Sequence, residues 1–330
     1  MTATNEYKNT HFARQTTYIG RFAPSPTGSL HFGSLLAATA SYLDAKAHQG
    51  KWLIRIEDVD TVRCKSEYTR EILDALHAHG FHSDKKIRLQ SEHFADYRAA
   101  LIQLLPRLYP CFCSRKTRQN SPKQAIYPRT CLYSPPHALE QDEQKSFIKR
   151  KIAEAGMPEN IQTQAAALRL FLGDRKISFT DRLYGEISSC AASDFSDPIL
   201  LRRDGNFAYN LAVVIDDIIQ GINSVVRGRD LLDTSATQIA IYEILGIKPP
   251  VYLHLPLITD KNKRKLSKQN QAPALDNSKA SENLIAVLKC LNQDISGIED
   301  NFPPEKILAI AIKNWNEEKI PKEIEYQLEN

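Results

Sequence analysis

The residues from Tyr18 to Ser34, YIGRFAPSPTGSLHFGS, constrain the fold of this chain more than any other stretch. The first five of them favour a β-strand, and two prolines, Pro24 and Pro26, prevent that strand from continuing. A helix is expected after the turn, from about Leu30 to Gln49. The stretch therefore predicts a strand that passes through a tight turn into a helix.

The start of this predicted helix is a favourable place for an anion. Backbone N–H groups of the first turn have no partner within a helix, and the helix dipole places partial positive charge there. Gly28 lets the backbone approach a ligand closely, and Thr27 and His31 add donors without fixed negative charge. The sequence thus predicts that a nucleotide phosphate binds at this turn.

A second strand is expected directly after the helix, at Lys51-Trp-Leu-Ile-Arg-Ile-Glu57, because this segment is rich in β-forming residues. Strand, helix and strand then form a parallel βαβ unit with a right-handed crossover. Ligands of such sheets bind outside the carboxyl ends of the strands. Residues 21–25 and the pair Glu57-Asp58 are therefore expected to line the same crevice.

The rest of the chain continues this alternation, with one interruption. Further helices are expected at residues 67–79, 92–105, 209–217, 234–245, 282–291 and 304–314, and further strands at residues 199–203, 224–228 and 251–258. From residue 109 to about 189 the alternation is lost, and prolines and cysteines accumulate. The sequence predicts an α/β protein with a parallel sheet and an inserted subdomain.

Composition narrows the class of protein only modestly. The net charge is +4 in a chain of 330 residues, which is too small to indicate a nucleic-acid partner by itself. There is no run of about 18 apolar residues and no apolar segment near the start, so neither a membrane span nor a signal peptide is predicted. We expect a cytoplasmic enzyme without a membrane partner.

Three cysteines and a tyrosine form a candidate metal site within the expected insertion. Cys111, Cys113, Tyr127 and Cys131 offer three thiolates and a phenol, enough for a closed four-coordinate zinc site. With all four positions filled, the zinc ion is structural, because no position stays open for a substrate. The alternative is water as the fourth ligand, with Tyr127 packed beside the site. Six scattered cysteines do not indicate a disulfide framework.

Two segments resemble the signature motifs of class I aminoacyl-tRNA synthetases. Pro24-Ser-Pro-Thr-Gly-Ser-Leu-His-Phe-Gly33 resembles the His-Ile-Gly-His signature, and Lys265-Leu-Ser-Lys-Gln269 resembles the later Lys-Met-Ser-Lys-Ser signature. Arg55-Ile-Glu-Asp58 and residues 209–217 are similar to segments of the glutamyl branch of that family. The resemblance covers about residues 17–275, and it is greatest to the short glutamyl paralogs that lack an anticodon-binding domain.

The resemblance implies a Rossmann-type parallel sheet with an inserted zinc-binding subdomain and a short helical C-terminal region that contacts the tRNA stem. The expected divisions are a mobile tail at 1–16, the first half of the catalytic domain at 17–108, the insertion at 109–192, the second half at 193–260, and the Lys-Leu-Ser-Lys loop with the helical region at 261–330. No anticodon-binding domain is expected in this chain.

ATP, accompanied by Mg²⁺, is the nucleotide that the resemblance implies. The residues implied to bind it are Thr27, Gly28, His31, Gly33 and Lys268. His31 and Lys268 are the implied catalytic residues, serving the α-phosphate and the leaving pyrophosphate, because activation needs donors that stabilise a pentacoordinate phosphorus. The alternatives are a helix-capping His31 and a solvated basic loop around Lys268. Ser34 stands where the signature usually has its second histidine, which removes one donor.

Glutamate is the implied amino-acid substrate. The residues implied to line its pocket are Arg21, Phe22, Ala23, Pro24, Ser25, Glu57, Tyr209 and Arg227. Recognition of its carboxylates favours guanidinium groups, and recognition of its ammonium group favours an acidic or phenolic acceptor. The alternative is that Arg21 and Glu57 form an internal ion pair and that Tyr209 belongs to the core.

The resemblance implies that a monomer forms glutamyl-adenylate and transfers the glutamyl group to the queuosine base of tRNA(Asp). One alternative is a C-terminally truncated glutamyl-tRNA synthetase that charges the tRNA 3′ end. Ser34, Gln269 and the Tyr127/Cys131 spacing argue against it. Another is a non-catalytic paralog that binds zinc and RNA, against which the two intact nucleotide signatures argue. A small-molecule ligase or nucleotidyltransferase is a more distant alternative.

Overall fold

The computed structural model of the chain describes residues 17–113, 127, 129–133, 141–156, 166–259 and 273–325. The tail expected at residues 1–16 lies outside these residues. The helices are α2 (Phe32–Ala47), α3 (Ser66–Ala78), α4 (Phe94–Leu104), α6 (Thr130–Tyr133), α7 (Gln141–Ala153), α8 (Tyr209–Gln220), α9 (Leu232–Ile244), α10 (Ala280–Cys290) and α11 (Pro304–Asn314). The strands are β1 (Ile19–Phe22), β2 (Lys51–Ile56), β3 (Arg88–Leu89), β4 (Leu108–Cys111), β5 (Ala167–Leu170), β6 (Lys176–Asp181), β7 (Gly185–Cys190), β8 (Ile199–Leu201), β9 (Ser224–Gly228), β10 (Val251–Leu255), β11 (Ile258–Thr259) and β12 (Ile324–Glu325).

The strand, turn and helix predicted at residues 18–49 are confirmed. β1 ends at Phe22, and α2 begins after its N-cap, His31. β2 pairs with β1 in parallel, with Ile19 opposite Lys51. The other expected helices and strands are also present, with ends that differ by a few residues. The strand predicted at residues 251–258 ends at Leu255, one residue before Pro256, because proline has no backbone N–H group to donate to a neighbouring strand.

Two groups of strands meet side by side at Asn223. One group has the order β1-β2-β3 and the other has the order β7-β6-β10-β9. The backbone N–H of Asn223 donates to the carbonyl oxygen of Ile19 at 3.1 Å, and its side-chain oxygen accepts from the N–H of Ile19 at 2.9 Å. β1 pairs with β2 in parallel, and β9 pairs with β10 in parallel. Residues at the carboxyl ends of all four strands line one pocket, so these ends lie at one edge.

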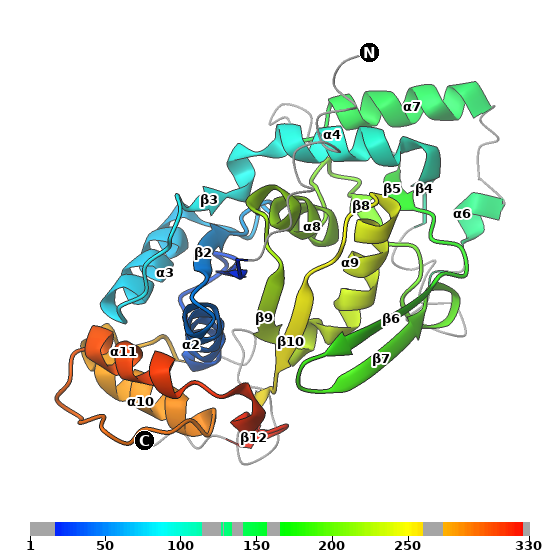
Figure 1. Cartoon of the computed structure of the whole chain (residues 1–330). Coiled ribbons are helices and arrows are strands. Elements are labelled where there is room, and N and C mark those ends of the chain that lie inside the picture. The colour runs from blue at the N-terminus through cyan, green and yellow to red at the C-terminus, as the bar shows by residue number, and fades with distance from the viewer. Residues whose placement is uncertain are drawn as a thin grey trace.

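Helices cover both faces of this arrangement, because neighbouring residues of each strand point to opposite faces. Trp52 and Ile54 lie in a core with α2, α3, α10 and α11, whereas Leu53 lies in a second core with α4, α7, α8 and α9. On β9, Val226 belongs to the first core and Val225 to the second. This is the packing of an open α/β sheet, and Figure 1 shows α2, α3, α10 and α11 grouped on one side.

A smaller antiparallel sheet, β4-β5-β8, lies beside the parallel strands. β6 and β7, which fall within the expected insertion, pair with β10 of the main sheet, and β8 from the expected second half pairs with β5. Strands on each side of the expected boundary between residues 192 and 193 therefore pair with strands on the other side. Long-range pairing of this kind leaves no local mark in the sequence.

The C-terminal helices α10 and α11 pack against α2 in the first core. Beyond α11, the indole Nε1 of Trp315 donates to Asp44 of α2 at 3.1 Å. Among the helices of the described residues, none is both long enough and apolar enough to cross a membrane.

Candidate functional site

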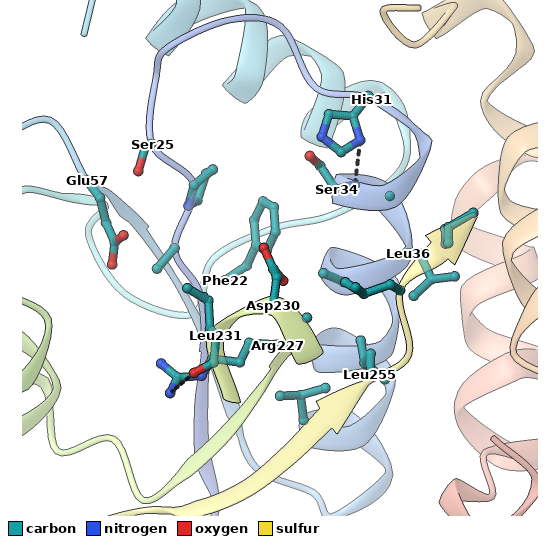
Figure 2. Close-up of a pocket in the computed structure, with 18 of the residues that line it drawn as sticks. Phe22, Ser25, His31, Ser34, Leu36, Glu57, Arg227, Asp230, Leu231 and Leu255 are labelled. Atoms are coloured by element: carbon teal, nitrogen blue, oxygen red, sulfur yellow. Dashed lines mark hydrogen bonds between the residues drawn. The ribbon is translucent and has the colours of Figure 1, made fainter. Parts of the chain in front are cut away.

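A pocket of about 590 Å³ lies at the carboxyl ends of β1, β2, β9 and β10, beside the start of α2 (Figure 2). The predicted site residues that line it are Arg21, Phe22, Ala23, Pro24, Ser25, Thr27, His31, Gly33, Glu57, Tyr209 and Arg227. Segments predicted separately to bind ATP and glutamate thus surround one cavity. Lys268, the other predicted catalytic residue, lies outside the described residues.

Gly28 is the exception among the predicted ATP-binding residues that the structure describes, because it does not line the pocket. The chain leaves the pocket edge at Thr27 and returns at His31. Between them, the Ser29 hydroxyl donates to Glu71 of α3 at 2.6 Å, and Leu30 is buried in the first core. This segment is therefore directed to the neighbouring helix and the core.

The start of α2 has the features of an anion site. The backbone of His31 is extended, and its Nδ1 accepts from the N–H of Ser34 at 3.3 Å (Figure 2). Since Nδ1 accepts, a neutral imidazole carries its proton on Nε2, where it is a donor. No acidic residue lies in the first turn of α2, so no carboxylate there repels a phosphate. His31 thus caps the helix and can also donate to a ligand.

Arg21 lies at the end of β1 and is almost fully buried. Its Nε donates to Oδ1 of Asp217 at 3.4 Å. Within the described residues, neither of its terminal Nη atoms has a hydrogen-bond partner, and the side chain lines the pocket. Among the described residues, both Nη groups of Arg21 therefore remain for a ligand, and Arg21 pairs with Asp217 where the alternative placed Glu57.

Glu57 is paired with Arg55, which was not among the predicted site residues. Arg55 is fully buried; its Nη2 lies 3.3 Å from Oε1 of Glu57 and its Nη1 lies 2.6 Å from Oδ1 of Asp217. Burial raises the pKa of Glu57, although Arg55 and Arg21 act in the opposite direction. Burial favours a higher pKa for Asp217 also, but Arg55 and Arg21 outweigh it, so that pKa is lowered.

Two further groups complete the polar lining. Tyr209 is the first residue of α8, and burial, followed by the charge of Glu57, raises the pKa of its phenol, which therefore stays protonated at neutral pH. Asp230 and Leu231, which were not among the predicted site residues, lie in the short 3-10 helix that follows β9, near Arg227 (Figure 2). A turn residue such as Asp230 carries no local signal that distinguishes it from an ordinary polar loop residue.

The predicted metal ligands also lie together, in a separate cluster with Tyr109. The sulfur atoms of Cys111, Cys113 and Cys131 all lie within 4.8 Å of one another. Sulfur ligands placed tetrahedrally about zinc at about 2.3 Å are roughly 3.8 Å apart, so the three thiols fit a zinc ion. The hydroxyl of Tyr127 lies 3.8 Å from Sγ of Cys113, at the side of the cluster.

The hydroxyl of Tyr127 accepts a hydrogen bond from the backbone N–H of Cys131 at 3.0 Å. Burial raises the pKa of this phenol, followed by its hydrogen bonds to Cys111 and Cys131. Ligation as a phenolate therefore requires a cation beside it to lower that pKa. The position of Tyr127 is suitable for a fourth ligand, and water remains the alternative.

The chain matches known proteins over most of its length. Residues 19–288 match the family model described as tRNA synthetases class I (E and Q), catalytic domain. The chain is 42% identical over 310 residues to the glutamyl-Q tRNA(Asp) synthetase of Acinetobacter baylyi, which covers 93% of this chain and 96% of that relative. It is 41% identical over 309 residues to the protein of the same name from Escherichia coli, covering 93% and 92%. The chain belongs to the glutamyl-Q tRNA(Asp) synthetase family.

Solved structures agree with this family at the level of the fold. A glutamate tRNA ligase from Elizabethkingia meningosepticum, described as in complex with its amino acid, superposes with a TM-score of 0.76 at 24% identity, covering 94% of this chain and 67% of that chain. The predicted class I synthetase fold with a parallel sheet is therefore confirmed. In this glutamyl-Q family member, the pocket lies between the first signature segment and the ends of β2, β9 and β10.

Proposed function

We propose that this protein is an ATP-dependent ligase that activates L-glutamate to glutamyl-adenylate and transfers the glutamyl group to the queuosine base of tRNA(Asp). The relatives' name, glutamyl-Q tRNA(Asp) synthetase, supports a glutamyl group and tRNA(Asp) as the substrates. The observation that carries the proposal is that one pocket joins the start of α2, suited to a phosphate, to the Nη groups of Arg21, which have no partner among the described residues and are suited to a carboxylate.

Activation joins the α-carboxylate of glutamate to the α-phosphorus of ATP. A carboxylate oxygen attacks phosphorus, the bond to the β-phosphate oxygen breaks, and pyrophosphate leaves. His31 and the N–H groups at the start of α2 stabilise the charge on the α-phosphate, and Lys268 stabilises the departing pyrophosphate. A hydroxyl of the queuosine cyclopentene-diol then attacks the activated carbonyl carbon, its proton is lost, and AMP leaves.

Glutamate is held by groups of both signs. The guanidinium groups of Arg21 and Arg227 attract its side-chain carboxylate, and Glu57 with the hydroxyl of Tyr209 accepts from its ammonium group. This division of roles rests on the position of all four side chains around the pocket. Aspartate is one methylene shorter and glutamine lacks the charge, so both are expected to bind more weakly.

Zinc is the metal we assign to Cys111, Cys113, Cys131 and Tyr127, because three buried or half-buried thiols are a donor set that zinc prefers. When bound, zinc supplies a structural cross-link between the two segments that carry these ligands. Mg²⁺ accompanies ATP. The protein acts as a monomer in the cytoplasm, where its tRNA is found.

Glutamate-dependent exchange of labelled pyrophosphate into ATP tests the activation step. We expect exchange with glutamate in the absence of tRNA, and none with aspartate or glutamine. Exchange that requires tRNA would favour a truncated glutamyl-tRNA synthetase, and no exchange under any condition would favour the non-catalytic paralog. In the same assay Lys268→Ala is expected to lose most activity and to keep the zinc content of the unaltered protein.

The acceptor is tested with labelled glutamate and tRNA(Asp) that contains queuosine but lacks its 3′-terminal adenosine. Transfer to the base predicts that this truncated tRNA is still labelled. The matched control is the full-length tRNA(Asp) with guanosine in place of queuosine, which is expected to stay unlabelled. The reverse pattern would show that the 3′ end is the acceptor.

A further inference from the structure

Arg227 is held from behind by a buried chain of hydrogen bonds that the proposed chemistry does not use. Its Nε donates to Nε2 of His254 at 3.1 Å, and Nδ1 of His254 lies 2.7 Å from Oδ2 of Asp181. Asp181, at the end of β6, is 1% exposed, and His254, on β10, is 0% exposed. The chain of contacts therefore runs from β6 through β10 to the pocket wall on β9.

This geometry selects one form of the imidazole. A guanidinium N–H can only donate, so Nε2 of His254 must accept from Arg227 and cannot carry a proton. The proton of the neutral ring is then on Nδ1, where it donates to the carboxylate of Asp181. Asp181 is fixed in turn by the backbone N–H groups of Leu183 and Tyr184, each at 3.0 Å. The carboxylate thus determines the tautomer that Arg227 requires.

The contacts of Arg227 leave its positive charge without a paired anion. Its Nη1 donates to the side-chain oxygen of Gln238 at 2.8 Å, and its Nη2 donates to the hydroxyl of Ser235 at 2.7 Å and to the carbonyl oxygen of Leu231 at 3.3 Å. All of its acceptors are neutral, and within the described residues it forms no ion pair. Arg55, by contrast, lies against the carboxylates of Asp217 and Glu57.

We propose that Asp181 and His254 are positioning residues that hold Arg227 through a neutral acceptor, so that the charge of this buried arginine is left for the carboxylate of the amino-acid substrate. The inference rests on the proposed function. A carboxylate in the place of His254 would hold Arg227 equally well but would neutralise it. A protonated His254 would present an N–H group to Arg227 and would displace it.

Because a protonated His254 would displace Arg227, binding of the substrate carboxylate depends on pH. Burial lowers the pKa of His254 below its ordinary value, although Asp181 acts in the opposite direction. Among the described residues, the charged or titratable groups around His254 are Asp181 on β6, Arg227 on β9, Arg21 on β1 and Tyr252 on its own strand. The carboxylate of Asp181 has a lowered pKa and the arginines stay charged, so His254 is the member of this group whose charge can change as the pH falls below the ordinary pKa of histidine.

The decisive experiment measures the KM values for glutamate and for ATP by pyrophosphate exchange. For His254→Leu, which lacks the acceptor, we expect the glutamate KM to rise about tenfold or more and the ATP KM to stay within about twofold. His254→Gln, whose amide oxygen can accept from Arg227, is expected to recover most of the loss. Tyr252→Phe is the matched control, because it alters the ring stacked on His254 and removes only a hydroxyl.

Two further measurements separate positioning from a merely structural role. As the pH falls below about 6.5, the glutamate KM of the unaltered protein is expected to rise more steeply than that of His254→Gln, in which Glu57 still titrates. Long-range ¹H–¹⁵N correlation spectra are expected to show His254 with its proton on Nδ1. A proton on Nε2, or a His254→Gln profile identical to that of the unaltered protein, would overturn the proposal.

Failure of the positioning role and failure of the proposed function give different results. An active protein whose His254→Leu variant keeps an unchanged glutamate KM refutes the positioning role and leaves the proposed function intact. An unaltered protein that shows no exchange with any amino acid refutes both. If His254→Leu does not fold, the His254→Gln pH profile and the tautomer decide the question.

Discussion

Arg21 and Arg227 line the same pocket, but they differ in which of their N–H donors are already bound to other protein groups. Arg227 uses donors at all three of its nitrogen atoms on neutral protein acceptors, whereas Arg21 uses only Nε within the described residues. Arg21 therefore has the geometry to bind a carboxylate with two parallel N–H groups, and Arg227 contributes mainly through its charge. The two arginines are expected to respond differently to substitution.

Replacement of Arg21 tests this difference at the level of one side chain. Arg21→Lys keeps the charge but removes the planar pair of donors, so the glutamate KM in the exchange assay is expected to rise by about 10-fold to 100-fold. The ATP KM is expected to change little, because the start of α2 is untouched. An equal rise in both KM values would mean that Arg21 supports the fold of the pocket and does not bind glutamate.

Glu57 is expected to lower the free energy of unfolding at neutral pH, although glutamate activation requires it. Its raised pKa means that the folded state binds the proton more tightly than the unfolded state does. Its favourable contribution is therefore present below the unfolded pKa of about 4.3 and is lost as the pH rises through the folded pKa. At pH 7, Glu57→Gln should raise the free energy of unfolding by about 1 kcal/mol while abolishing glutamate activation.

Urea unfolding of the two proteins at pH 7 and at pH 4 checks this prediction. The advantage of Glu57→Gln should shrink at pH 4, because Glu57 of the unaltered protein is then largely protonated in the folded state. A variant that is less stable than the unaltered protein at pH 7 would contradict the predicted sign. It would show that attraction to Arg55 outweighs the cost of burial.

The sequence predicted the positions of those pocket-lining residues that follow from local signals. Arg21 and Glu57 come at the ends of two recognisable strands, so their meeting follows from the parallel pairing of β1 and β2. Asp217 was missed because it lies in the buried middle of α8, and its partner Arg55 is 162 residues away in the sequence. Nothing local marks a buried carboxylate as the acceptor for a distant arginine.

At the scale of elements, the carboxylate of Asp197 connects the two chain segments that carry Cys111 and Cys131. Asp197 accepts from the hydroxyl of Tyr109 at 2.8 Å, two residues before Cys111, and from Nε of Arg129 at 3.0 Å, two residues before Cys131. It is fully buried. Asp197, which precedes β8, therefore fixes the distance between β4 and the start of α6.

Asp197→Asn should loosen this arrangement, because an amide N–H then faces donors that need an acceptor. For zinc-loaded protein, we expect the metal to pass to a colorimetric chelator about tenfold faster than from the unaltered protein. Asp174→Asn is the matched control, since Asp174 also contacts Arg129, at 3.3 Å, but its side chain is 83% exposed. Equal release from both variants would show that Asp197 does not organise the metal ligands.

Element boundaries divide into those that sequence can predict and those that it cannot. The βαβ unit at residues 19–56 has its own strand, turn and helix signals, and it was predicted correctly. The pairing of β6 with β10 and of β5 with β8 depends on contacts between distant segments, so the expected boundary at residues 192 and 193 did not anticipate it. Pairing partners in a sheet are set by packing of the whole chain.

At the scale of the whole molecule, Asp44 of α2 connects parts of the chain that are far apart in sequence. Its buried carboxylate accepts from the hydroxyl of Tyr18, from both Nη atoms of Arg182 at 2.7 and 2.8 Å, and from the indole of Trp315 at 3.1 Å. These residues belong to the start of the described chain, the turn between β6 and β7, and the segment after α11. The helix that begins beside the pocket is thereby anchored to three distant segments.

Loss of this carboxylate should therefore destabilise the whole molecule and not one segment. Asp44→Asn removes the fully buried one of the two carboxylates beside Arg182, the other being the partly exposed Glu317, and we expect the free energy of unfolding to fall by about 2 to 3 kcal/mol. Urea unfolding followed by fluorescence measures this, because the two tryptophans, Trp52 and Trp315, lie on β2 and after α11. A single transition that moves to lower urea is the expected result.

The matched control for Asp44→Asn is Glu243→Gln, which breaks an ion pair between α9 and Arg175 at 3.0 Å in which both side chains are substantially exposed. Because solvent screens such a pair, its loss should cost less than about 1 kcal/mol. If Asp44→Asn gave two separate transitions, with the Trp315 signal lost first, the C-terminal helices would unfold independently of the sheet. Equal shifts for the two variants would mean that solvent reaches Asp44 and that its contacts do not bind the segments together.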